Sequence, residues 1–108
     1  MAENNEIIDH PDYYRLPDGR DLEDYIADAR LDFILGSALK YMWRAGKKHG
    51  ESRDKDLAKA DHYIKFKARR CGCDESLVIA DLSARLKWLE SGKPREADLE
   101  PPALDLTP

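Results

Sequence analysis

Two rows of polar side chains, spaced by three and four positions, carry residue types that bind phosphate. The first row is Ser37, Lys40, Arg44 and Lys47, and the second is Asp56, Lys59, Tyr63 and Lys67. Side chains at these spacings share one face of an α-helix, so one ligand could touch a whole row. Arginine and lysine neutralise phosphate oxygens, and arginine can hold two oxygens at once. The two rows predict a site for a phosphorylated ligand.

The charge along the chain favours the same ligand class. Eleven of the 18 Lys and Arg residues fall between positions 40 and 70, where only four acids occur, so this segment carries +7. Residues 1–39 carry −7 and residues 71–108 carry −4, which gives the overall −4. A basic middle between acidic flanks predicts an anionic partner for the middle segment.

Helical periodicity predicts four helices and no strand. We expect the first helix to be capped by Asp21 and to run to about Arg30, and the second to cover residues 31–48 with its end marked by Gly46. The third follows a polar turn, is capped by Ser52 or Asp54, and stops at Gly72. The fourth is capped by Asp74 and ends at residues 91–92.

These elements predict an all-α fold, a small bundle of three to four helices built around an antiparallel α-hairpin. We expect an irregular N-terminal arm over residues 1–20, a helical domain over 21–92 and a disordered acidic tail over 93–108. In the second helix, Ile34, Ala38 and Met42 are expected to face the core, with the first polar row on the opposite side. In the third helix, the side chains expected to face inward are Leu57, Ala60, Ile64 and Ala68.

Length and composition narrow the class of protein. A chain of 108 residues supports one domain with a modest core. It has no run of 18 apolar residues and no signal-peptide pattern, so we expect a cytoplasmic protein without a membrane partner. Cys71 and Cys73 are expected to be free thiols in a reducing compartment. Trp43 and Trp88 in so small a chain predict a homo-oligomer.

Three short motifs, in this order, resemble a protein family of phages. They are HPDYY from His10, GSALKYMWRAGKK from Gly36 and DLAKADHYI from Asp56. The family, a domain of unknown function, typically shows His-Tyr near its start, then Gly-Asn-Ala-Ile-Lys-Tyr-x-x-Arg-x-Gly-x-Lys and Asp-Leu-x-Lys-Ala-x-x-Tyr. The resemblance covers about residues 10–66. Its matching positions are Gly36, Lys40, Tyr41, Arg44, Gly46, Lys48, Asp56, Leu57, Lys59, Ala60 and Tyr63.

Some members of that family are named as the small early nucleotide kinase of podophages. The resemblance implies an oligomeric deoxynucleoside monophosphate kinase in the cytoplasm of an infected bacterium, with Mg²⁺ and ATP as cofactors. It implies that Arg44 and Lys59 act in catalysis with Asp56, which would bind Mg²⁺ or orient the acceptor. Ser37 stands where the family pattern has Asn. The implied ligand-binding residues are Ser37, Lys40, Tyr41, Arg44, Lys47, Lys48, Lys59 and Tyr63.

Other interpretations of these residues stay open at this stage. The basic rows could be solvated helix faces, Tyr41 and Trp43 are expected to pack rather than stack on a base, and Asp56 could be a favourable charge at a helix N-terminus. No Walker-type phosphate loop fits, because position 41 is not glycine, and the histidines lack zinc-ligand spacing. A different function class is a non-enzymatic phage protein that inhibits a host defence protein or sequesters a nucleotide signal. Direct nucleic-acid binding is not expected, since the acidic flanks would repel a duplex.

Overall fold

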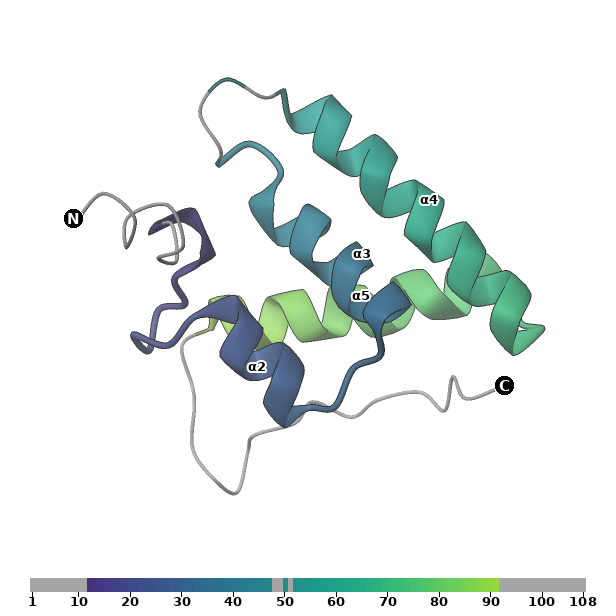
Figure 1. Cartoon of the computed structure of the whole chain (residues 1–108), viewed down its shortest axis with the longest axis horizontal. Helices are drawn as coiled ribbons and strands as arrows, with labels where there is room; N and C mark the ends of the chain where they lie inside the picture. The colour runs from purple at the N-terminus through teal and green to yellow at the C-terminus, as the bar shows by residue number, and fades with distance from the viewer. Residues whose placement is uncertain (1–11, 48–49, 51, 92–108) are drawn as a thin grey trace, which may run out of the picture.

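The computed structural model describes residues 12–47, 50 and 52–91, and this part of the chain is helical (Figure 1). A 3₁₀ turn, η1 (Asp12–Tyr14), precedes the α-helices, which are α2 (Leu22–Asp28), α3 (Phe33–Arg44), α4 (Arg53–Cys71) and α5 (Glu75–Glu90). The only β pairing among the described residues is an isolated bridge between Arg15 and Asp21. The prediction of an all-α fold is confirmed. The expected tail at 93–108 and the first eleven residues of the expected arm lie outside the described residues.

The starts of the helices are set by local capping. Asp32 accepts a hydrogen bond from Leu35 N (2.8 Å) at the start of α3, and Asp74 accepts one from Ser76 N (2.9 Å) at the start of α5. Ser52, rather than Asp54, caps α4. Each cap satisfies a backbone N–H that lacks a partner in the first turn of a helix. The caps at Asp21 and Asp74 are as predicted, and of the two residues predicted for α4, Ser52 is the cap.

The ends of the two hairpin helices differ in how well the sequence predicts them. Gly72 ends α4 in the left-handed conformation (φ 68°), as predicted, because glycine adopts positive φ without a steric penalty. Helix α3 is shorter than the predicted 31–48 segment. It begins after Asp32 and ends at Arg44, since Ala45 leaves the helical conformation before Gly46 is reached.

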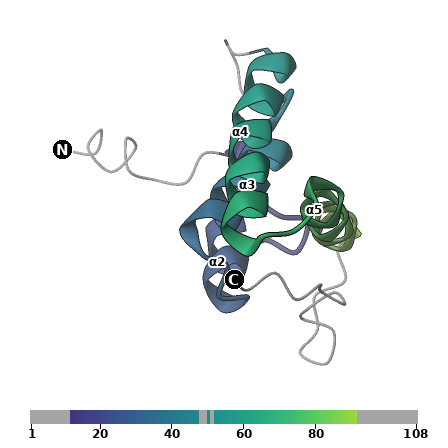
Figure 2. The same ribbon diagram turned by 90° about the vertical axis from the view of Figure 1, so that its right-hand side faces the viewer.

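Helices α3 and α4 lie antiparallel and side by side, with the turn between them at one end (Figure 1). Helix α5 packs against this hairpin from one side only, as the turned view shows (Figure 2). The core lies where the helices meet and includes Leu39, Val78 and Leu82, each with no measurable exposure. The antiparallel α-hairpin at the centre of the fold is as predicted.

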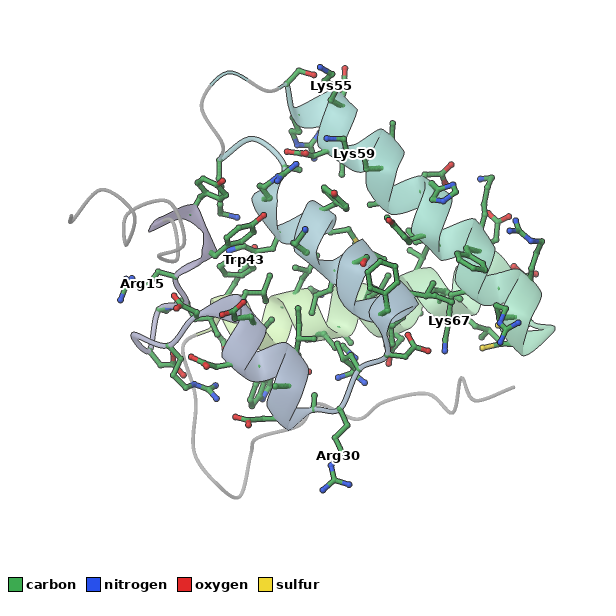
Figure 3. The ribbon with its side chains drawn as sticks, viewed as in Figure 1. Arg15, Arg30, Trp43, Lys55, Lys59 and Lys67 are labelled. Carbon is green, nitrogen blue, oxygen red and sulfur yellow. The ribbon has the colours of Figure 1, made fainter. Side chains whose placement is uncertain are left out.

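The N-terminal segment contributes to this core. Leu16 is 3% exposed, and Trp43 Nε1 donates a hydrogen bond to Tyr13 O (2.8 Å), so that Trp43 lies between α3 and the N-terminal segment (Figure 3). Residues 13–16 of the expected arm are therefore attached to the helical domain. An aromatic side chain with a bonded N–H is a strong anchor for such a segment.

The predicted core face of the hairpin is partly wrong. Ile34 and Met42 are only half-buried, whereas Arg44, which was expected on the solvent side, is 7% exposed. In α4, Leu57 is half-buried while Asp56 and Lys67 are buried. The periodicity argument placed the first polar row, which includes Arg44, opposite the core, and the structure instead buries charges that have partners of opposite sign.

Candidate functional site: an aromatic and cationic cluster on the hairpin

One ion pair links α3 to α4 near each end of the hairpin. Near the turn, Arg44 at the end of α3 meets Asp56 in the first turn of α4, with Arg44 Nη2 2.7 Å from Asp56 Oδ1. At the other end, Lys67 Nζ of α4 lies 2.7 Å from Oδ2 of Asp32, the cap of α3. Because the partners come from opposite ends of the two helices, the pairs hold the helices antiparallel. The two ion pairs therefore fix the relative positions of the α3 and α4 residues that lie between them.

Arg44 is engaged on more than one side. Its Nε and Nη2 both donate to Asp56 Oδ1, at 3.2 and 2.7 Å, and its Nη1 donates to the Tyr14 hydroxyl at 3.2 Å. The hydrogen bonds from Arg44 to Asp56 raise the pKa of the guanidinium above its ordinary value. Burial raises the pKa of Tyr14 as well, although the hydrogen bond from Arg44 opposes that rise. Arg44 therefore stays charged and ties η1 to the hairpin.

Asp32 has a similar role at the far end of the hairpin. Partial burial alone would raise its pKa, but the hydrogen bonds from Lys67 Nζ and Leu35 N outweigh burial and hold the pKa below its ordinary value. A carboxylate with a lowered folded-state pKa stabilises the fold above its unfolded pKa, and that stability is lost as the pH falls through the folded-state pKa. Asp32 thus makes the hairpin acid-sensitive.

Replacing Asp32 with asparagine is expected to destabilise the protein at neutral pH by about 1 kcal/mol, a modest cost because the carboxylate is half exposed. The difference between variant and wild type should begin to shrink as the pH falls below about 4, near the unfolded-state pKa of an aspartate, and should vanish only below the lowered folded-state pKa. Urea unfolding at pH 7 and at pH 3 measures this. An equal difference at both pH values would contradict the ionic role of Asp32.

The side chains of both polar rows converge around the ring of Tyr41. Lys40 Nζ lies 4.8 Å from the ring centroid, Arg44 Cζ also 4.8 Å, and Lys59 Nζ of α4 5.3 Å. The ring of Tyr63 is nearly parallel to that of Tyr41, at an angle of 9° and a centroid distance of 6.1 Å. We call this set, Lys40, Tyr41, Arg44, Lys59 and Tyr63, the hairpin cluster.

The hairpin cluster joins α3 to α4, so side chains of the two polar rows meet across the hairpin. Lys40, Tyr41, Lys59 and Tyr63 are all partly accessible to solvent. Phe33, which is 73% exposed, adds its edge to Tyr63 at a centroid distance of 5.9 Å. The result is an accessible surface on which aromatic faces and ammonium groups alternate.

Lys40 also borders two hollows beside the cluster. One has a volume of about 210 Å³ and is lined in part by Phe33, Gly36, Ser37 and Lys40. The other, of about 60 Å³, lies against α2 and is lined in part by Tyr14, Glu23 and Lys40. Ser37 therefore lies beside the cluster rather than within it.

The remaining predicted site residues are placed differently. Lys47 turns back on its own helix end, where Nζ donates to Trp43 O (2.6 Å) and lies 4.3 Å from the Trp43 ring centroid. Lys48 lies outside the described residues. Asp56 has no exposed surface, and its Oδ1 accepts a hydrogen bond from Arg44 Nη2.

The geometry of Asp56 does not fit a magnesium ligand. Mg²⁺ keeps several waters in an octahedral shell, so a protein carboxylate that binds it must reach solvent. Over the described residues, no group of three His, Cys, Asp or Glu side chains could hold a metal ion. Asp56 instead accepts hydrogen bonds from Arg44 and holds that side chain in position.

The tryptophans and cysteines behave as parts of the domain. Trp43 is buried, and Trp88 is half-buried with its ring 5.9 Å from that of Tyr25. These contacts within one chain leave the expected homo-oligomer as a prediction. Cys71 and Cys73 are free thiols, as expected, and burial together with the neighbouring Cys71 raises the pKa of Cys73.

Sequence reasoning missed Tyr14 and Phe33 as neighbours of the site. Tyr14 reaches Arg44 across thirty positions of sequence, which no local pattern reveals. Phe33 could have been found, because it precedes Ser37 by four positions and so shares its helix face.

No helix within residues 12–47, 50 and 52–91 is both long and apolar enough to cross a membrane. Comparison with curated proteins gives no significant match, and comparison with solved structures gives none either. A family model does match, over residues 8–65, a range that includes all five residues of the hairpin cluster and covers more than half of the chain. The chain therefore belongs to the family described as protein of unknown function, DUF3310.

Proposed function

We propose that the hairpin cluster binds a nucleoside phosphate. The observation that carries the proposal is the convergence of Lys40, Arg44 and Lys59 on the ring of Tyr41. Three cations around one ring, one of them already paired with Asp56, make this surface basic, and an anion placed among them would be attracted. Inorganic phosphate would satisfy the cations alone, whereas a nucleotide would also use the aromatic surface.

In this proposal each part of the ligand meets a different part of the cluster. The ammonium groups of Lys40 and Lys59 bind the phosphate, and the exposed ring of Phe33 and the partly exposed ring of Tyr63 offer a surface for the base. Arg44 acts through its charge and holds the Tyr41 side of the cluster in place, since Asp56 and Tyr14 already occupy its donors. Ser37 lines the adjoining hollow, where a sugar or a second phosphate would lie.

The nature of the nucleotide follows from the resemblance of the motifs to phage early nucleotide kinases. The proposed ligand is a deoxynucleoside monophosphate, and the proposed setting is the cytoplasm of a phage-infected bacterium. Phosphoryl transfer depends mainly on positioning and on neutralising charge, which a cationic cluster can supply. ATP would bring Mg²⁺ on its own phosphates in this scheme.

Each deoxynucleoside monophosphate is expected to raise the melting temperature of the protein, because a ligand of the folded state stabilises it by mass action. At one hundred times the dissociation constant the gain is about 2.7 kcal/mol, or about 11–22 °C for a domain of this size. Lys40→Ala should weaken binding about tenfold or more, the usual cost of losing a charge-assisted hydrogen bond. Calorimetric titration with the monophosphate measures this loss, and ADP release from added Mg·ATP reports kinase activity.

The matched control is Lys65→Ala, on the same helix as Lys59 but outside the cluster. Lys65 pairs with Asp61 and Glu75 on the surface, so its loss changes the net charge equally and leaves the cluster intact. Equal weakening by both substitutions would mean that only net charge matters and would contradict a defined site. Absence of any thermal shift at millimolar monophosphate would contradict nucleotide binding altogether.

A further inference from the structure

A second series of rings and cations runs along the outer face of α4 and shares Lys59 with the hairpin cluster. Its members recur at spacings of four and three, which places them on one face of the helix. We call them the α4 row: Lys55, Lys59, His62, Phe66 and Arg69. Lys55 and Lys59 lie on the part of α4 near the turn (Figure 3), and Arg69 lies in the last turn.

The α4 row is continuous with the hairpin cluster. The ring of His62 lies 5.0 Å from that of Tyr63 and 6.3 Å from that of Phe66. Arg69 Cζ then lies 5.4 Å from the Phe66 centroid. From Tyr41 through Tyr63, His62 and Phe66 to Arg69, the centres of successive planar groups are thus 5.0–6.3 Å apart.

Two of the three acids of α4 are engaged away from this face, and the third, the exposed Asp54, lies about 100° around the helix from Lys55. Asp56 is buried against Arg44, and Asp61 pairs with Lys65, which in turn reaches Glu75 on α5. No aspartate or glutamate belongs to the α4 row, and Arg70 beside Arg69 adds another exposed cation. The row is therefore basic at both ends and aromatic between them.

We propose that the α4 row extends the hairpin cluster into a binding surface for single-stranded nucleic acid. Bases of an unpaired strand can stack on successive aromatic faces, and the cations at both ends can meet its phosphates. The row spans about 21 Å of helix from Lys55 to Arg69, which suits a strand of about four nucleotides, the lower end of known site sizes.

Charge and ring exposure favour this partner over others. A duplex hides its base faces and would meet the acidic flanks, whereas a single strand can follow the acid-free face alone. A second copy of this face would bring like charges together, which disfavours self-association through the row. The inference rests on the proposed function, because the hairpin cluster would hold the terminal nucleotide of the strand.

The test is fluorescence anisotropy with labelled oligothymidylates of two, four and eight nucleotides and the full-length protein. Affinity should rise about tenfold or more between two and eight nucleotides, because each added stacked base contributes. The logarithm of the binding constant should fall with the logarithm of salt with a slope near −2, as for about three phosphate contacts on a single strand. If the octanucleotide binds no more tightly than the dinucleotide, the inference is overturned, while binding of the monophosphate would keep the proposed function standing.

Substitutions in the α4 row test whether this face of α4 binds the strand. Phe66→Leu keeps an apolar side chain and should weaken octanucleotide binding about tenfold by removing one stacking partner, with monophosphate binding unchanged. Arg69→Gln, an exposed change that leaves the core intact, should reduce the salt slope by about 0.7. The control Lys65→Gln, on the acidic side of α4, should change neither quantity.

Two further results would overturn the proposal. Displacement of the octanucleotide by an equal concentration of duplex would show attraction to charge without base stacking. If Phe66→Leu lowers the mass of the protein in light scattering and leaves octanucleotide affinity unchanged, the row is a contact between subunits.

Discussion

Asp56→Ala is expected to lower the free energy of unfolding by about 3–5 kcal/mol, the cost of breaking a buried ion pair by removing one partner. The carboxylate is fully buried and Oδ1 accepts two hydrogen bonds from Arg44, whose side chain is only 8% exposed. The variant keeps the guanidinium buried and takes away this countercharge. Since small domains are stable by only about 5–15 kcal/mol, a large fraction of Asp56→Ala should be unfolded in mild urea.

The double variant Arg44→Met, Asp56→Leu is the informative control. Apolar side chains of similar size remove both charges together, and such exchanges are often neutral or stabilising. The double variant should therefore recover most of the stability lost in Asp56→Ala, as measured by urea unfolding followed by circular dichroism. It should also bind the monophosphate more weakly than wild type, because it lacks one cation beside Tyr41. A loss below about 1 kcal/mol in Asp56→Ala would instead describe a solvated surface pair.

Arg85→Ala is expected to be about as damaging, again by about 3–5 kcal/mol for a buried pair. Arg85 Nε donates to Asp81 Oδ2 at 2.9 Å, and Nη1 donates to the Tyr25 hydroxyl at 2.6 Å. All three residues are at most 5% exposed. The contact joins α5 to α2 across sixty positions of sequence, so its loss should detach α2 from the bundle.

Tyr25→Phe separates the hydroxyl from the charge in this contact. It removes one hydrogen bond and keeps the ring against Trp88, so a loss of about 1 kcal/mol is expected. Thermal unfolding and amide hydrogen exchange of residues 22–28 provide the measurements. If Arg85→Ala costs no more than Tyr25→Phe, the ion pair with Asp81 contributes nothing beyond the single hydrogen bond.

The sequence predicts those parts of the fold that depend on neighbours in the chain. The caps at Asp21 and Asp74 and the left-handed end at Gly72 each involve residues within one turn of the helix they bound. The buried ion pair between α3 and α4 does not depend on neighbours in the chain, so local patterns do not predict it. Arg44 and Asp56 meet because a turn brings two helix ends together, and the periodicity argument, which placed Arg44 opposite the core, did not predict its burial.

The candidate site was predictable in its position but not in the state of each residue. Spacing alone places Lys40, Arg44 and Lys59 on rows that an antiparallel hairpin can bring together, and they do surround Tyr41. Whether a cation is already engaged depends on contacts across helices. The sequence could not show that Lys47 folds back onto Trp43 O, because that bond depends on the exact place where α3 ends.

The ion pairs at the two ends of the hairpin have a mechanical consequence. Slippage of α4 along α3 by one helical turn, about 5.4 Å, would break Arg44–Asp56 and Asp32–Lys67 at the same time. The helices therefore cannot adjust their register in small steps, and the rings they carry keep their axial separations. Adaptation to ligands of different size must come from rotation of Tyr41, Tyr63 and Phe33 about their own side-chain bonds.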